Sequence, residues 1–302
     1  MSEVSFRAQQ SANKRKTFFL LALFGGLTGL VIYAALSYFG QSSAGVVPIA
    51  VLISVLSVWG SYFASDKLVL TMTGAKLIQE SDNPRLFALI QEVCLASGLP
   101  MPKVAIVEDS APNAFATGRN PEHGLIAFTT GILDAMDRDE LQGVIAHEMS
   151  HVGNRDTLVS AIAATTAGAI AMISDFLMRM MWWGGGRRDN RDGGNNPLAL
   201  IASLVVLILA PIAAMLLKAA ISRRREALAD ATAVAFTRNP TGLRKALEVL
   251  QADSTIVRHA SNSVAHLYIE SPLDSSNVSK LFATHPPLAE RIAILRSMEN
   301  GV

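Results

Sequence analysis

The chain has 302 residues, of which half are apolar and only 17% are charged, a low charged fraction for a soluble protein. This length suffices for one compact domain with extra elements, or for two small domains. The net charge of +1 argues against a nucleic-acid-binding protein, which needs a basic face, and the single cysteine excludes an internal disulfide.

The first long feature of the chain is a stretch without charged side chains, from residue 17 to residue 65. One crossing of the hydrocarbon core of a bilayer takes about 20 residues, so this stretch can hold two transmembrane helices. We place them near residues 17–39 and 44–65. The apolar region of a cleaved signal peptide is shorter, about 7–15 residues, so the first helix is predicted to be a retained anchor.

A second apolar pair follows in residues 157–217. Residues 157–174 and 197–217 are each long enough to cross a bilayer, and neither contains a charged side chain. The alternative is a buried core hairpin. The Gly-rich loop between them, residues 184–196, has no periodicity and is predicted to be a flexible linker.

The distribution of lysine and arginine predicts the orientation in the membrane. Basic clusters lie just before the first apolar helix and just after the fourth, which places both termini in the cytoplasm. Three arginines in the loop 184–196 argue in the opposite direction. The predicted organisation is a cytoplasmic N-terminal tail (1–16), two transmembrane helices (17–65), the first part of a cytoplasmic domain (66–156), a second transmembrane hairpin (157–217) and the second part of that domain (218–302).

The segment after residue 66 is predicted to begin with a helix and a small sheet. Asn83 is a cap residue and Pro84 suits the first helical position, and apolar residues then recur at helical spacing until Gly98. Cys94 lies on this helix without an activating partner, so it is predicted to be a core thiol. Short β-rich runs bounded by turn residues predict strands at 103–107, 113–118 and 124–129.

A further helix is expected to begin at Arg138, because Asp137 and Glu140 have the spacing of a capping box. Later helices are predicted at residues 223–237, at 241–251 and from Pro286 onward. The predicted fold class is therefore α+β, mostly helical with a small sheet, combined with about four transmembrane helices.

The helix expected from Arg138 carries the sequence His147-Glu148-Met149-Ser150-His151. At about 100° of rotation per residue, His151 points about 40° from His147, and Glu148 lies about 100° round. Two imidazoles on one face, beside a carboxylate that can act as general base, are what a catalytic zinc site needs. The alternative is two histidines satisfied by ordinary hydrogen bonds. The position of the motif in mid-helix, behind a capping box and a small sheet, favours the metal site.

A catalytic zinc takes three protein ligands and leaves one position open, so a third ligand is needed. Glu226 and Asp230 are four residues apart on one helix face, so one could bind metal while the other holds the second nitrogen of a histidine ligand. Their alternative role is a solvated acidic face. An even number of membrane crossings must separate the motif from Glu226, and the predicted hairpin satisfies this condition. The other candidates for the third ligand are Asp156, His285 and Glu290.

Four motifs resemble those of the HtpX family of membrane metalloproteases, which are relatives of the CaaX prenyl protease. The resemblance covers nearly the whole chain, and the two apolar hairpins around the catalytic segment match it as well. The motifs are His147-Glu148-Met149-Ser150-His151, Asn-Ala-Phe-Ala-Thr-Gly at 113–118, Ser-Arg-Arg-Arg-Glu-Ala-Leu-Ala-Asp at 222–230 and Thr-His-Pro-Pro at 284–287.

The resemblance implies a zincin-like catalytic domain of the gluzincin type, with one Zn²⁺ per chain. It implies that His147, His151 and Glu226 are the zinc ligands. Glu148 would be the catalytic base, and Asp230 would orient His147.

The resemblance also implies how substrates are bound and where the protein acts. His285 would lie near the substrate and could stabilise the oxyanion. The family degrades misfolded or damaged membrane proteins at the cytoplasmic face of the bacterial inner membrane, in quality control and stress response. Such proteins and the lipid bilayer are the expected partners, and other quality-control proteases are candidates. The edge strand that pairs with an extended substrate backbone would consist of Asn113, Ala114, Phe115, Ala116 and Thr117.

Two other functions stay open. A proteolytically inactive scaffold would hold zinc with four protein ligands in a closed site, but it would not need Glu148. A CaaX-type enzyme that processes prenylated peptides would have the same site, although that relative has more membrane spans around a large chamber. No motif explains the loop 184–196 or residues 253–279.

Overall fold

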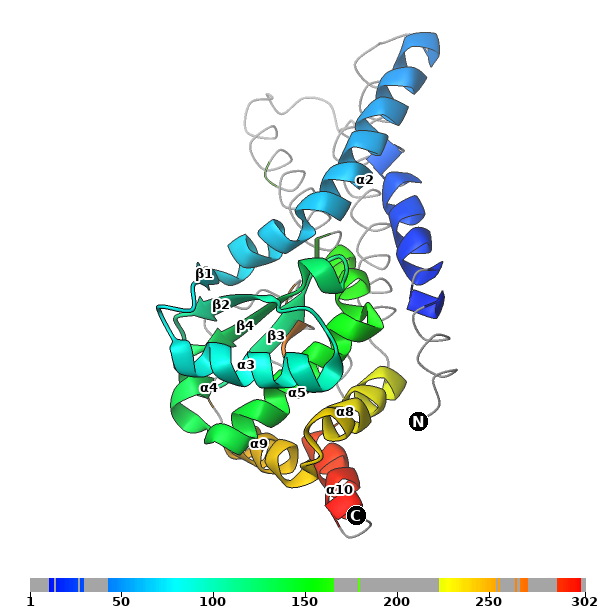
Figure 1. Ribbon diagram of the computed structural model, residues 1–302. Helices are drawn as coiled ribbons and strands as arrows, with labels where there is room; N and C mark the ends of the chain where they lie inside the picture. The colour runs from blue at the N-terminus through cyan, green and yellow to red at the C-terminus, as the bar shows by residue number, and fades with distance from the viewer. Residues whose placement is uncertain are drawn as a thin grey trace, which may run out of the picture.

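The computed structural model describes residues 11–13, 15–26, 28–29, 43–165, 179, 223–253, 255, 264, 267–270 and 287–299 (Figure 1). Several sequence expectations fall outside this part of the chain. They concern the ends of the first and third apolar segments, the whole fourth segment, the loop 184–196, His285, and most of residues 253–279.

The sheet consists of β1 (Lys76–Ile78), β2 (Lys103–Val107), β3 (Ala114–Thr117) and β4 (Leu125–Thr129). The strands lie in the order β1-β2-β4-β3, so β3 is at one edge. β2 and β4 run parallel, with Val104 opposite Ile126, whereas β1 and β3 run antiparallel to their neighbours. The three strands expected from the sequence are confirmed, and β1 is an additional strand that the sequence did not predict.

The helices of the described part include α2 (Ser43–Thr73), α3 (Pro84–Ser97), α4 (Thr130–Ala135), α5 (Arg138–Asn154), α8 (Arg223–Thr237), α9 (Pro240–Ala252), α10 (Leu288–Glu299) and the short 3-10 helix η1 (Pro121–His123). The Asn83 side chain caps α3, which ends at Gly98 in the left-handed conformation, φ 69°. The Asp137 side chain accepts from the Glu140 backbone, and the Glu140 carboxylate accepts from the Asp137 N–H, so α5 has the expected capping box. The fold is therefore mostly helical with a small mixed sheet, as predicted.

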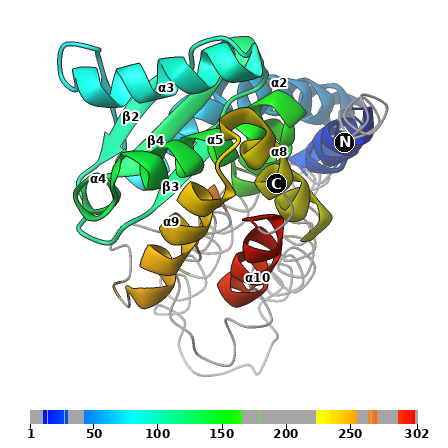
Figure 2. The same cartoon turned by 60° about the horizontal axis from the view of Figure 1, so that its bottom comes forward.

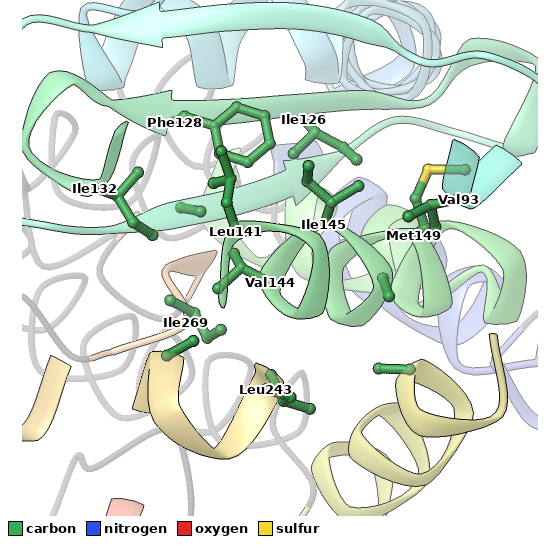
Figure 3. Close-up of a cluster of buried hydrophobic side chains, with 14 of the residues drawn as sticks. Val93, Ile126, Phe128, Ile132, Leu141, Val144, Ile145, Met149, Leu243 and Ile269 are labelled. Atoms are coloured by element: carbon green, nitrogen blue, oxygen red, sulfur yellow. The ribbon is translucent and has the colours of Figure 1, made fainter. Parts of the chain in front are cut away.

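α5 lies at the centre of the domain. Its apolar residues Ile145 and Met149 belong to one buried cluster with Ile126 of the sheet (Figure 3). On another side α5 contacts α8 and α9, and α10 packs against these two helices (Figure 2). The approach of α9 is so close that a Cβ on Gly143 would lie 2.7 Å from the backbone of Leu243. The helix that carries the histidine motif is therefore held between the sheet and the helices α3, α8 and α9.

α2 contains the second predicted apolar segment and continues beyond it to Thr73. It extends away from the sheet (Figure 1), and large apolar side chains such as Leu56 and Trp59 are exposed along it. No single helix among the described residues has both the length and the apolar character to cross a bilayer. The stretches Val47–Gly60 and Tyr62–Thr73 have both only when taken together, across a bend of 62°. The number of transmembrane helices thus stays a prediction.

Candidate metal centre

α5 and α8 bring the three predicted metal ligands together. The Nε2 atoms of His147 and His151 lie 3.2 Å apart. Carboxylate oxygens of Glu226 lie 3.7 Å from the first of these atoms and 3.8 Å from the second. A tetrahedral zinc ion with bonds of about 2.1 Å holds its donor atoms about 3.4 Å apart. The three side chains therefore fit a metal ion of this kind.

His147 is oriented by a carboxylate and an arginine. Its Nδ1 lies 2.9 Å from Oδ1 of Asp230, as the sequence predicted for this pair. Arg291 of α10 donates to both oxygens of Asp230, at 2.9 Å from Nε and 2.7 Å from a terminal nitrogen. Burial, and then the charge of Arg291, lower the pKa of His147 to about 4, so its imidazole is neutral, as a metal ligand must be.

Arg291 is a site residue that the sequence reasoning missed. Only 2% of it is exposed, and it is the bulkiest of the fully buried side chains of the described part. Burial opposes the charge of Asp230, but Arg291 and His147 outweigh it and hold the pKa of Asp230 well below its usual range. One signal could have identified Arg291, because it lies between Leu288 and Ile292 on the face of a helix that apolar residues otherwise occupy.

The second histidine, His151, faces a different carboxylate, that of Asp156. Its Nδ1 lies 3.0 Å from Oδ2 of Asp156, a residue that was one of the candidates for the third ligand. Asp156 therefore faces the far side of the imidazole, away from the Nε2 atom. Burial lowers the pKa of His151, but the carboxylates of Glu226 and Asp156 outweigh burial and raise it to about 9. The site thus favours a cation, and a metal ion bound at Nε2 would displace the proton from this ring.

Two of the remaining candidates for a third ligand, Asp230 and Glu290, do not join this group. Asp230 faces Nδ1 of His147, Glu290 is exposed on α10, and His285 lies outside the described residues. Among the residues that the structure describes, the group able to hold a metal ion consists of His147, His151 and Glu226.

Glu148 is buried beside the three ligands. Burial raises its pKa to about 7, with an opposing effect from His151 and a reinforcing one from Glu226. A backbone hydrogen bond from Ala116 of β3 also acts on this carboxylate, whereas its Oε1 atom has no hydrogen-bond partner within the described part. A carboxylate with a pKa near neutrality and one unused oxygen can accept a proton from a water molecule in the site.

The predicted substrate strand lies at the sheet edge next to α5. Part of its outer edge is taken by the chain itself, because Phe115 pairs with Tyr268 and the Ile269 N–H donates to the Ala114 carbonyl at 2.9 Å. The Asn113 amide donates to the Glu270 carbonyl at 3.0 Å and accepts from the Glu270 N–H. In the other half of the strand, the backbone of Ala116 hydrogen-bonds to Glu148.

Comparisons with known proteins agree with this geometry. The model of peptidase family M48 matches residues 80–299, a range that includes every metal-centre residue described above. A Protease HtpX homolog of Streptococcus gordonii is 46% identical over 293 residues, covering 96% of this chain and 99% of that protein. Another, of Thermoanaerobacter pseudethanolicus, is 42% identical over 300 residues, covering 99% of both.

Among solved structures, the crystal structure of S. mikatae Ste24p has a similar fold, with a TM-score of 0.50 and 17% sequence identity. The match covers 95% of this chain and 66% of the Ste24p chain. From the family match, the near-complete coverage of the HtpX homologues and the assembled His-His-Glu group, the chain belongs to peptidase family M48 and is a metalloendopeptidase.

Proposed function

We propose that the chain is a membrane-integrated zinc endopeptidase that cleaves misfolded or damaged membrane proteins. The observation that carries this proposal is the convergence of His147, His151 and Glu226 beside the buried carboxylate of Glu148. Two nitrogen donors and one carboxylate are typical of catalytic zinc sites, which leave one position open. Because the nearby Asp230 and Asp156 face Nδ1 atoms, the arrangement favours such an open site over a closed four-ligand site.

Each residue of the site then has a distinct task. Zinc, when bound, supplies Lewis-acid activation of water and polarisation of the scissile carbonyl. Glu148 accepts the proton of the attacking water and delivers it to the leaving amine when the C–N bond breaks. A pKa of about 7 suits a group that must both take up and release a proton near neutral pH. Asp230 and Asp156 accept from the Nδ1–H groups and so keep the Nε2 atoms directed at the metal.

We place an extended substrate along the rest of the β3 edge, at Ala116 and Thr117, where the described residues form no further backbone pairing. Ala116 hydrogen-bonds to Glu148 through its backbone, whereas the edge at Ala114 and Phe115 is paired with Tyr268 and Ile269. Backbone pairing of this kind reads little side-chain sequence, which suits a protease for unfolded chains. His285 is proposed to lie near the oxyanion.

We place the protein in the bacterial inner membrane, with its catalytic domain in the cytoplasm and a role in stress response. The exposed apolar side chains of α2 support a membrane location. The apolar helix Asp156–Thr165 begins at the metal centre, because Asp156 contacts His151. This contact supports a zinc site close to the cytoplasmic surface of the bilayer.

The test compares wild type and Glu148→Gln, purified in detergent with zinc, in cleavage of an unfolded membrane protein. We expect activity to fall by at least about 100-fold, because a general base is lost, while zinc stays bound, because Glu148 is not a ligand. His151→Ala is the matched control and should lose zinc as well. Undiminished cleavage by Glu148→Gln would refute the proposal, and cleavage confined to prenylated peptides would indicate a CaaX-type enzyme instead.

A further inference from the structure

The N-terminal segment reaches the metal centre through one side chain. Asn13 lies in the helical residues that precede the first apolar segment, and it is fully buried. Its Nδ2 donates to the backbone carbonyl of Asn154 at 2.9 Å and also to Oδ1 of Asp156. Both neighbours are acceptors, so the amide nitrogen must face them. These partners are 141 and 143 positions further along the chain, so the contact joins the N-terminal segment to the end of α5.

Both oxygens of Asp156 are engaged as a result. Oδ2 faces Nδ1 of His151 at 3.0 Å, and Oδ1 accepts from Asn13. Asp156 follows directly after Arg155, which has a left-handed φ of 59° at the end of α5. Asp156 thus begins the apolar helix Asp156–Thr165, just beyond the turn that ends α5, and the hydrogen bond from Asn13 restrains the direction of its carboxylate.

Other side chains of the helical segment that carries Asn13 are also buried. Thr17 and Leu20, one and two turns further along, are buried as well, at 7% and 3% exposure. Burial and the nearby charge of Arg225 lower the pKa of Lys16, whereas Asp156 opposes this effect, so Lys16 faces the same cluster. Several side chains of the segment are thus buried or lie near this cluster, and Asn13 is the one whose contact with the carboxylate behind His151 is a hydrogen bond.

We propose that Asn13 is a positioning residue of the metal centre: it fixes Asp156, which directs His151 toward the metal. The amide supplies a donor without adding a charge, so Asp156 keeps its full negative charge for the imidazole. The N-terminal segment thereby completes a site whose ligands all lie more than 130 residues away. This inference rests on the proposed zinc site.

The test is a double-mutant cycle on the full-length chain in detergent, with zinc affinity measured by competition with a fluorescent chelator. We expect Asn13→Ala to weaken zinc binding by about 10-fold, the lower end of the range for losing an outer support of a ligand. In the Asp156→Ala background the same change should have no further effect, because Asn13 acts through that carboxylate. Ser11→Ala, on the exposed side of the same helix, is the matched control.

Melting temperatures of the metal-free proteins report whether each variant folds. If Asn13→Ala does not fold, Asn13→Asp replaces it, because it has nearly the same shape but cannot donate and repels Asp156. The inference would be overturned if Asn13→Ala bound zinc as tightly as the Ser11→Ala control. It would also be overturned if Asn13→Ala lost the same zinc affinity in the wild-type and the Asp156→Ala backgrounds. If His147, His151 and Glu226 do not bind zinc at all, His151→Ala will leave the zinc affinity unchanged. That result separates failure of the proposed zinc site from failure of the role of Asn13.

Discussion

The two histidines of the metal centre are held in different ways. His147 is completely buried, and its partner Asp230 receives two charged hydrogen bonds from Arg291. The His151 side chain is 14% exposed, and its partner Asp156 receives a neutral amide from Asn13. Arg291 is a cation that donates to both oxygens of Asp230, whereas Asn13 is uncharged and donates to one oxygen of Asp156. Bidentate hydrogen bonds between two ions are the stronger and more directional kind, so we expect the His147 side to be the more rigid.

The two supports also come from different parts of the chain. Asp230 belongs to α8, which contacts α5, and Arg291 belongs to α10, which packs against α8 and α9. Asn13 and Asp156 each stand beside an apolar segment that we propose enters the membrane. One ligand is therefore fixed by the core of the catalytic domain and the other by the membrane segments. Changes in the domain core should act first on His147, and changes in the membrane segments first on His151.

The largest expected effect is that of Arg291→Met. The change leaves the buried carboxylate of Asp230 without its cationic partner, which typically costs about 3–5 kcal/mol of unfolding free energy. Denaturant unfolding of the metal-free protein would measure this loss. Arg296→Ala is the control, because Arg296 is exposed and its ion pair with Glu248 should contribute less than about 1 kcal/mol.

Adding Asp230→Asn to Arg291→Met tests the cause. If the instability comes from an unpaired buried charge, removal of that charge should restore much of the lost free energy. A double variant as unstable as Arg291→Met alone would show instead that the packing of the arginine stem dominates.

A smaller effect should separate the two carboxylates behind the histidines. Asp230→Asn and Asp156→Asn are each expected to weaken zinc binding by about 10–100-fold. The loss should be greater for Asp230→Asn, because the charge of Arg291 then faces His147 without compensation. Chelator competition under identical conditions gives both affinities. Equal losses, or a greater loss for Asp156→Asn, would contradict the asymmetry.

The ligands of this centre could be predicted from the sequence because each depends on a local pattern. The capping box of Asp137 and Glu140 fixes where α5 begins, and the helical period then places both histidines on one face. The spacing of Glu226 and Asp230 put both on one helix face, so that one could bind the metal and the other a histidine, and the resemblance chose Glu226 for the metal. In the structure Glu226 lies near both Nε2 atoms and Asp230 faces Nδ1 of His147.

The supports could not be predicted because they join residues that are far apart in the sequence. Arg291 is 61 positions from Asp230, and Asn13 is 143 positions from Asp156. Spacing alone also cannot tell which nitrogen of an imidazole a carboxylate faces, so Asp156 stayed a candidate ligand. Strand β1 has only three residues, two of them exposed, and it is defined by pairing with β2.

The smallest expected effect concerns Glu270, on the segment that Arg291 and Asn113 hold against the edge of β3. Burial, reinforced by Asp253, raises the pKa of Glu270 to about 7. In the unfolded chain the pKa of a glutamate is about 4.3, so the folded state binds the proton of Glu270 more tightly than the unfolded state does. The stability that this proton contributes is complete below about pH 4.3 and is lost as the pH rises through about 7. Glu270→Gln should therefore stabilise the protein at pH 8 and leave it unchanged at pH 4.

Because solvent reaches part of this side chain and screens its charge, the gain at pH 8 should be only on the order of 1 kcal/mol. Melting temperatures of variant and wild type at both pH values measure it, and their difference cancels the titration of all other groups. A gain at pH 8 would mean that the ionised Glu270 carboxylate weakens the packing of residues 268–270 against the β3 edge in alkaline solution. A difference that does not change with pH would show that Glu270 titrates in the same range in the folded and unfolded chains.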